Sequence, residues 1–477
     1  MKSDKLLLFI TILLIKVLCF PLFLFSGQNN ELIEGIWLGT LKLPGAELRI
    51  GLTISKTDTG TFTATMNSID QGSGEIPMDE VKFKDPHLVI TGKSLGVQFE
   101  GDVNYEQGTL DCEFRQGFAK LPLLFQKVDY LPVLSRPQEP KRPLPYHEEM
   151  VDYENVAGSV HIAATLTCPD SGGPFPAVIL LTGSGAQNRD EEIFGHKPFL
   201  VLSDYLTRRG IAVLRADDRG IGGTSGSFQG STTGDFAEDA LAGVKYLLTR
   251  NEIDPDLIGL VGHSEGAMMA SIAASESDQI SFIVLMAGVG IRFDDIIFYQ
   301  KEIRWKAAGM SEDDLKLQRE WHNNVTNIAV QDLNDQEITE AIQNLYVKLS
   351  DKEKERLGKT PESIQKEIEW TLNPWHRYAS RFNARKIFSH VRCPVLAING
   401  SKDTQVPADI NLDAIEKACI AGGNNQVTVK KLDGLNHLFQ TAGTGFESEY
   451  AKIDETMSPE AMKVIADWIQ KISAVKK

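Results

Sequence analysis

The sequence predicts an all-β domain followed by an α/β domain, in which a doubly wound, mainly parallel sheet carries a helical insertion. Apolar runs of strand length alternate with helix-favouring stretches from residue 151 onward. Runs that are apolar throughout are typical of parallel strands buried on both faces. They lie at 177–181, 212–216, 258–261, 282–286 and 395–399.

Residues 31–130 predict a small barrel-like domain, because short segments rich in Val, Ile, Thr and Phe are separated by turn signals. These segments lie at 48–54, 61–66, 87–91 and 97–103. The opening Gly35-Ile-Trp37-Leu-Gly39 resembles the GxWxG start of lipocalin-like barrels, and we expect Trp37 to close the core. Five prolines in residues 131–150 predict a stiff linker ahead of a catalytic domain at 151–477.

The N-terminus predicts export to the periplasm or the exterior. Two lysines, an apolar stretch at 6–25 and the small residues Ser26 and Gly27 are typical of a signal peptide over residues 1–27. An uncleaved membrane anchor is the alternative, since the stretch is long for a signal peptide. After cleavage we expect no stable membrane span.

Charge and cysteine content exclude several classes of partner. The formal net charge of -16 argues against nucleic acid, which needs a basic face. The cysteines at 112, 168, 393 and 419 are scattered without metal-ligand spacing, so we expect buried thiols. Neither a metal nor a cofactor is expected, and the oligomeric state stays open.

The candidate nucleophile is Ser264, in Gly262-His-Ser-Glu-Gly266. This G-x-S-x-G stands between the strand at 258–261 and a helix at 267–274, which is the context of a nucleophile elbow. The turn must be sharp, and its close approaches need glycine at 262 and 266. The sequence therefore predicts a serine hydrolase.

A serine nucleophile needs a base and an acid, which follow it in the chain in this type of fold. Of the histidines at 322, 376, 390 and 437, only His437 follows a strand, at 426–432, and so lies at a ligand-binding strand end. Asp403 follows the strand at 395–399 and would orient His437. The rival carboxylates are Asp409, Asp413 and Asp433.

The oxyanion hole is expected to combine two backbone amides. Glu265 supplies the first, directly after the nucleophile. Ser184, in the glycine-rich loop after the strand at 177–181, is our choice for the second, with Gly185 as the alternative. Arg219, in an Asp-Arg-Gly turn, is expected to brace the site through an ion pair with Asp190 or Asp239, although it could instead bind an acidic substrate.

Residues 292–385 predict a helical lid inserted between two strands. The segment is charged and helix-favouring, and it holds four of the six tryptophans in the chain. These aromatic side chains either line a substrate pocket or attach the lid to the sheet domain. The four are Trp305, Trp321, Trp370 and Trp375.

Several motifs jointly resemble those of the EstD-type esterases, a branch of the α/β-hydrolases, over residues 150–477. They are Leu181-Thr-Gly-Ser-Gly-Ala-Gln-Asn-Arg-Asp-Glu191, Asp218-Arg-Gly-Ile-Gly222, Gly262-His-Ser-Glu-Gly266, Pro374-Trp375, Cys393-Pro-Val-Leu-Ala397 with Asp403, and Asn436-His437. The resemblance implies a carboxylesterase for short acyl chains, with Ser264, Asp403 and His437 as triad and a small-molecule ester as substrate. More distantly, the chain resembles serine aminopeptidase-like hydrolases and acyl-CoA thioesterases.

Two alternative functions stay open. The same triad would also serve a peptidase, a thioesterase or an acyltransferase. In a function of another class, the β domain would bind a ligand or a glycan, and hydrolysis would be incidental.

Overall fold

The computed structural model describes residues 33–43, 46–72, 74–117 and 119–476. They fall into an N-terminal unit, Met1–Val133, and a C-terminal unit, Leu134–Lys477. The expected signal peptide at 1–27 lies outside the described residues. Within the described ranges, no helix has the length and apolar character needed to cross a membrane.

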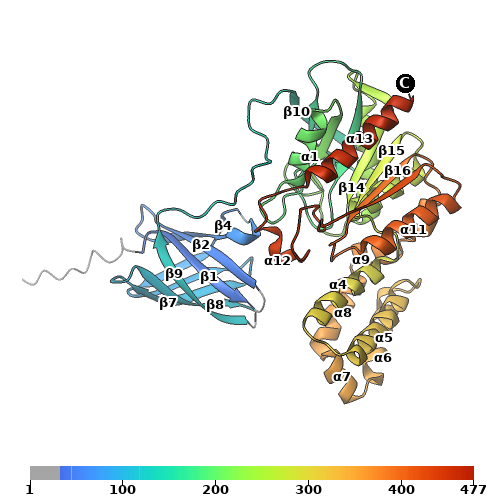
Figure 1. The fold of residues 1–477 in the computed structure, drawn as a ribbon. Coiled ribbons are helices and arrows are strands. Elements are labelled where there is room, and N and C mark those ends of the chain that lie inside the picture. Colours follow the sequence, from blue (N-terminus) through green and yellow to red (C-terminus); the bar gives the residue numbers. More distant parts are fainter. Residues whose placement is uncertain (1–32, 44–45, 73, 118, 477) are drawn as a thin grey trace, which may run out of the picture. The chain divides into compact units, whose positions relative to one another are not determined.

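Among the described residues of the N-terminal unit, nine strands form one antiparallel sheet in the order β4-β3-β2-β1-β9-β8-β7-β6-β5 (Figure 1). The two ends of this sheet lie close together. The amide of Met78 donates to the carbonyl of Ala64 at 2.9 Å, and the rings of Phe62 and Phe83 pack edge-to-face with centroids 5.9 Å apart. The strands are β1 (Gly35–Leu43), β2 (Ala46–Lys56), β3 (Phe62–Ser68), β4 (Ile76–Pro77), β5 (Glu80–Lys84), β6 (His87–Gly92), β7 (Val97–Asn104), β8 (Thr109–Gln116) and β9 (Ala119–Val128).

The interior of this curved sheet is filled by side chains. Trp37 is almost completely buried, and its indole N–H donates to the carbonyl of Ile33 at 2.9 Å. Phe99 and Phe125 pack in the same cluster, with ring centroids 5.9 Å apart. The expected role of Trp37 in closing the core is confirmed.

The C-terminal unit is built on a mainly parallel sheet. Its described residues form eight strands in the order β10-β11-β13-β12-β14-β15-β16-β17, in which β11 runs antiparallel to both neighbours and the pairs from β13 onward are parallel. This arrangement is the α/β-hydrolase fold and confirms the predicted fold class. The strands are β10 (His147–Asn155), β11 (Val160–Cys168), β12 (Phe175–Leu181), β13 (Ala212–Ala216), β14 (Ile253–His263), β15 (Phe282–Met286), β16 (Val395–Gly400) and β17 (Val427–Leu432).

Helices cover both faces of this sheet because successive strand residues point to opposite sides. Val178 packs toward α1 and α13, whereas its neighbour Ile179 packs toward α2 and α3. Apolar runs without alternation therefore fit strands buried on both faces, as predicted. The covering helices are α1 (Pro198–Thr207), α2 (Thr233–Leu247), α3 (Glu265–Glu276), α11 (Ala408–Ala421) and α13 (Pro459–Lys476), and the short α12 (Glu447–Tyr450) precedes α13.

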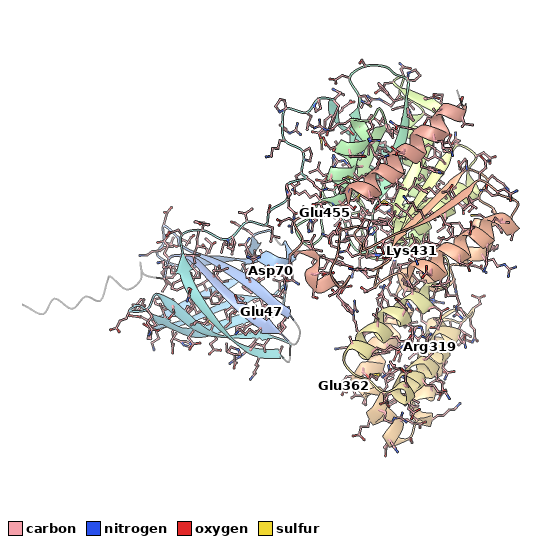
Figure 2. The ribbon with its side chains drawn as sticks, in the orientation of Figure 1. Glu47, Asp70, Arg319, Glu362, Lys431 and Glu455 are labelled. Carbon is pink, nitrogen blue, oxygen red and sulfur yellow. The ribbon has the colours of Figure 1, made fainter. Side chains whose placement is uncertain are left out.

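A helical insertion, α4 to α10, connects β15 to β16, as the sequence predicts (Figure 1). Its middle helices α5–α8 bury a core of their own, which includes Trp321, Ile338, Ile342 and Ile364. Charged side chains such as Arg319 and Glu362 cover its surface (Figure 2). The helices are α4 (Phe293–Ala307), α5 (Glu312–Ala329), α6 (Asp335–Lys348), α7 (Asp351–Leu357), α8 (Pro361–Leu372), α9 (Pro374–Ser380) and α10 (Ala384–Phe388).

The proline-rich segment ahead of β10 is bonded to the C-terminal unit. Residues 134–146 contain no helix or strand. The Arg136 guanidinium donates to the carbonyl oxygens of Gly195 at 2.9 Å and Ala451 at 3.0 Å, and Gln138 donates to Met457 at 2.7 Å. These contacts fix the segment at the loops that follow β12 and β17.

Candidate active site

Ser264 lies at a sharp turn between β14 and α3. Its backbone is strained, with φ of 53° and ψ of −112°, and its amide donates to the carbonyl of Met286 at 2.8 Å. A Cβ at Gly262 would lie 2.1 Å from the carbonyl oxygen of Gly266, and a Cβ at Gly266 would lie 2.1 Å from that of Leu181. The turn therefore requires both glycines, as expected for an elbow that presents the serine above the sheet.

The structure brings His437 and Asp403 together at the carboxyl ends of β17 and β16. His437 Nδ1 lies 2.8 Å from Asp403 Oδ2, and both residues are buried. The other carboxylate oxygen accepts the amides of Gln405 and Val406, each at 2.8 Å. The backbone thus fixes the aspartate, and its other oxygen faces the His437 ring, as an acid that orients the base of a triad requires.

The rival acids and histidines have other partners. Asp409 pairs with Lys431, Asp413 with Lys417, and Asp433 accepts the Ser401 hydroxyl at 3.0 Å. His322 and His376 both contact Asp294 within the insertion, and His390 Nδ1 faces the carbonyl of Lys386. His437 and Asp403 remain the pair that fits base and acid.

The loop of His437 contacts the nucleophile turn directly. The ring of His263, which immediately precedes Ser264, lies 4.8 Å from the His437 ring between centroids, and its Nε2 lies 3.0 Å from the His437 carbonyl oxygen. The Ser264 hydroxyl makes no hydrogen bond with the described residues. Catalytic hydrogen bonds are commonly long in the absence of substrate, so this geometry is compatible with His437 as the base for Ser264.

The candidate oxyanion donors are the backbone amide of Glu265 and an amide of the loop after β12. Glu265 is the first residue of α3, where helix amides lack intrahelical partners and the helix dipole favours negative charge. Ser184 is exposed in the loop after β12, and its amide donates to no described residue. The amide of Gly183 is already used, since it donates to Glu191 Oε1 at 2.7 Å. Ser184 and Gly185 both remain candidates for the second donor.

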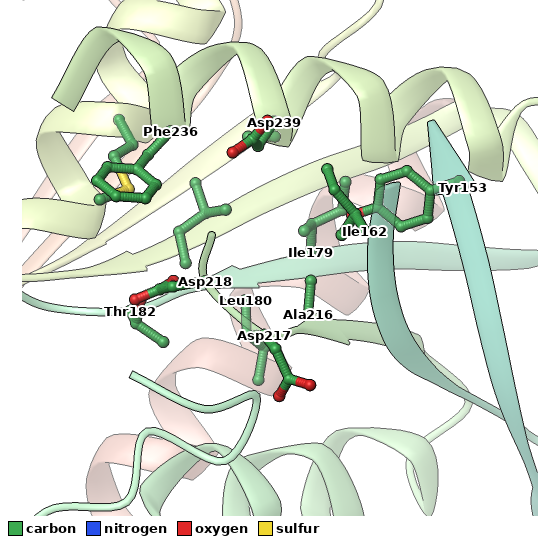
Figure 3. Close-up of a pocket in the computed structure, with 13 residues that line it drawn as sticks. Tyr153, Ile162, Ile179, Leu180, Thr182, Ala216, Asp217, Asp218, Phe236 and Asp239 are labelled. Carbon is green, nitrogen blue, oxygen red and sulfur yellow. The ribbon is translucent and has the colours of Figure 1, made fainter. Parts of the chain in front are cut away.

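Asp218 holds the glycine-rich loop 182–191 after β12, named here the oxyanion loop because it carries the candidate donors Ser184 and Gly185, and no role for Asp218 was predicted from the sequence. Its carboxylate accepts the Thr182 hydroxyl at 3.1 Å and the Gln187 amide at 2.8 Å. It lines a small cavity of about 40 Å³ beside Phe236 (Figure 3). Burial raises the pKa of Asp218 to about 7.

Arg219 has the bracing role expected of it. Its guanidinium contacts Asp239 at 2.6 Å, whereas Asp190, the other expected partner, pairs with Arg215. The binding of an acidic substrate by Arg219 is therefore disfavoured, because a buried, paired guanidinium has few donors left.

The insertion contacts the site through Trp375. Its indole N–H donates to Glu265 Oε1 at 2.5 Å, and the Thr233 hydroxyl donates to the same oxygen at 2.7 Å. Burial raises the pKa of Glu265. Trp375 thus attaches the insertion to the residue after the nucleophile, whereas Trp321 packs inside the insertion.

The cysteines within the described residues form no metal cluster with histidine or carboxylates. Cys112, Cys168 and Cys419 are buried, and burial raises the pKa of the first two thiols to about 12 and that of the third to about 11. For these three, the expectation of buried thiols is confirmed.

Two curated relatives match part of the chain. Esterase EstD of Thermotoga maritima is 36% identical over 112 residues, which are 24% of this chain and 27% of that protein. The putative hydrolase YtaP of Bacillus subtilis is 30% identical over 128 residues, covering 24% of this chain and 43% of that protein. The chain thus matches less than half the length of either relative. The predicted resemblance to EstD-type esterases is confirmed over that stretch.

Solved structures and a family model complete the comparison. An esterase of Pyrococcus furiosus is 16% identical, with 68% of this chain and 91% of that chain covered and a TM-score of 0.40. Est1E of Butyrivibrio proteoclasticus, solved with ferulic acid, is 16% identical, with 68% and 99% covered and a TM-score of 0.41. The family model described as X-Pro dipeptidyl-peptidase (S15 family) matches residues 158–417, more than half of the chain. The chain therefore belongs to the S15 family.

Proposed function

We propose that the chain is a serine hydrolase that cleaves carboxylic esters with short acyl groups. The observation that carries the proposal is a strained serine between β14 and α3, together with a buried histidine that an aspartate contacts at 2.8 Å and whose backbone contacts the residue before that serine. A serine hydroxyl is a weak nucleophile by itself, and an adjacent base removes this limitation. The partial likeness to Esterase EstD supports ester chemistry.

The reaction proceeds through an acyl-enzyme. Ser264 Oγ attacks the ester carbonyl while His437 Nε2 accepts its proton, and Asp403 stabilises the imidazolium. The amides of Glu265 and Ser184 donate to the oxyanion. Collapse of this intermediate expels the alcohol, which takes its proton from His437. Water, activated by the same imidazole, then hydrolyses the acyl-serine.

A second candidate function is peptide hydrolysis, which family membership specifically favours. A panel of chromogenic substrates separates the candidates: short acyl esters that release a phenol, an X-Pro dipeptide amide that releases an aromatic amine, and an acyl thioester that releases a thiol. We expect kcat/KM to be highest for the esters, with a pre-steady-state burst from acyl-enzyme accumulation. A higher kcat/KM for the X-Pro amide than for every ester would assign the chain to the peptidases instead.

We also propose that the insertion acts as a lid on the substrate pocket, supported by the contact of Trp375 with Glu265. Replacing Trp375 by phenylalanine removes the hydrogen bond of the indole and leaves a buried carboxylate with one donor fewer. We expect a rise in KM larger than the fall in kcat, and a loss of about 1–2 kcal/mol in the free energy of unfolding. Steady-state kinetics and urea titration measure the two effects.

The matched control is Trp370→Phe. Trp370 also lies in the insertion and contacts the Trp375 ring at 5.8 Å between centroids, but its side chain is 44% exposed. It should change KM little. Equal changes in KM for the two variants would argue against a specific role for the Trp375–Glu265 contact.

A further inference from the structure

His263 takes no part in the proposed reaction, although it stands between the two catalytic loops. It is buried, and its side chain lies between Glu191 and the His437 backbone. Nδ1 lies 2.8 Å from Glu191 Oε1, and Nε2 lies 3.0 Å from the carbonyl oxygen of His437.

Both partners of this ring are hydrogen-bond acceptors. A carbonyl oxygen has no proton to give, so Nε2 must carry a hydrogen. An ionised carboxylate likewise only accepts, so Nδ1 must carry one too. A histidine with both ring nitrogens protonated is an imidazolium cation. Burial lowers the pKa of a histidine, but the charge of Glu191, the hydrogen bond to that carboxylate and the hydrogen bond to the His437 carbonyl together raise the pKa of His263. The nearby negative charge of Asp403 acts in the same direction.

Glu191 is held in an unfavourable backbone conformation. Its φ of 52° lies in the left-handed region, which is unfavourable for a residue other than glycine. Its side chain is buried, and Oε1 accepts the Gly183 amide at 2.7 Å as well as the His263 ring. A strained residue persists where the contacts around it allow only one arrangement. Here those contacts are made with Gly183, in the loop after β12, and with His263, in the nucleophile turn.

We propose that Glu191 and His263 form a buried carboxylate–imidazolium pair that positions the oxyanion loop and the His437 loop against the nucleophile turn. One end of the pair holds Gly183, directly before the candidate donor Ser184. The other end holds the backbone of the base itself. Both are positioning residues, and their role rests on the proposed function of Ser264 and His437.

The charge state is measured on the intact protein. We would label histidine with nitrogen-15, record long-range ring correlations at about pH 7, and assign the His263 signals by their loss in His263→Gln. We expect both ring nitrogens of His263 to show imidazolium shifts. The competing arrangement is a neutral pair, in which a protonated Glu191 donates to Nδ1. Neutral-imidazole shifts would establish that arrangement and overturn the ion pair.

The positioning role is measured with Glu191→Gln, which keeps the size of the side chain and removes its charge. We expect kcat to fall about 100-fold on whichever substrate the panel shows to be turned over, with a smaller change in KM, because misplacement of catalytic groups by about 1 Å has this effect. The His263 signals should change to those of a neutral ring. An unchanged kcat overturns the positioning role.

The control is Glu192→Gln, the same substitution one residue along the chain. Glu192 is exposed, and within the described part of the chain its carboxylate accepts from the Asn188 side chain alone, at 3.1 Å, so kcat should match wild type. If Glu191→Gln does not fold, Glu191→Asp tests the positioning role instead, because it keeps the charge on a shorter side chain. A reduced kcat with retained imidazolium shifts supports the proposal. A wild-type kcat overturns it. The histidine spectrum needs no substrate, so failure of the ion pair and failure of the ester chemistry are distinguishable.

Discussion

Replacing Ser264 by alanine is expected to lower kcat for ester hydrolysis by a factor on the order of 10⁴ to 10⁶. The substitution removes the only atom of the proposed site that can form the acyl-enzyme, whereas oxyanion donors and substrate contacts remain and leave a weak residual rate. The fold should be preserved, because the hydroxyl makes no hydrogen bond with the described residues. Initial rates at saturating substrate and a thermal melt measure both expectations.

Ser275→Ala is the matched control. Ser275 lies on the same helix α3, and its hydroxyl donates to the carbonyl of Ile272 at 2.8 Å. Its turnover should equal that of wild type. Ester hydrolysis by Ser264→Ala at a rate near wild type, with intact folding, would remove Ser264 from the reaction and with it the proposed function.

Asp403→Asn is expected to lower kcat about 10⁴-fold with little change in KM. Oδ1 of the asparagine can still accept the amides of Gln405 and Val406, so the loop is retained. Its NH₂ group then faces His437 Nδ1, which must become an acceptor. The hydrogen of the ring consequently moves to Nε2, the atom that has to take the proton of the serine. The variant is therefore a folded enzyme with the wrong tautomer of its base.

Asp433→Asn serves as the control, because Asp433 is a nearby carboxylate in the His437 loop that, among the described residues, accepts from the Ser401 hydroxyl alone. We expect wild-type kinetics for it. If Asp433→Asn lost activity and Asp403→Asn did not, the rival carboxylate would be the acid. If both variants have the same thermal stability, a difference between their kcat values reflects catalysis and not loss of folded protein.

The sequence predicted the inner strands of the sheet because these are the segments buried on both faces. The strands β10 and β11 were not predicted from the sequence. Of the two, β10 is an edge strand in which exposed and buried residues mix, with Met150 71% exposed. The elbow could be predicted because its glycines and flanking elements are local in sequence. His437 and Asp403 could be placed because both follow strands, and parallel strands end at one edge.

The supporting contacts of the site could not be predicted in this way. The pairing of Glu191 with His263 depends on a left-handed residue in a long loop, for which glutamate gives no sequence signal. The contact of Trp375 with Glu265 joins residues 110 positions apart, one of them in the insertion. Such contacts are set by tertiary packing, and no local pattern of residue types carries them.

The separate core of α5–α8 has a consequence for how this scaffold can diversify. Residues such as Ile338 and Ile342 bury against one another and not against the sheet. The stretch from Glu312 to Leu372, which forms α5–α8, can thus be lengthened, trimmed or replaced during evolution while the apolar faces of the strands stay covered. We expect descendants of this scaffold to acquire new selectivities mainly by rewriting that one module, with the catalytic loops inherited unchanged.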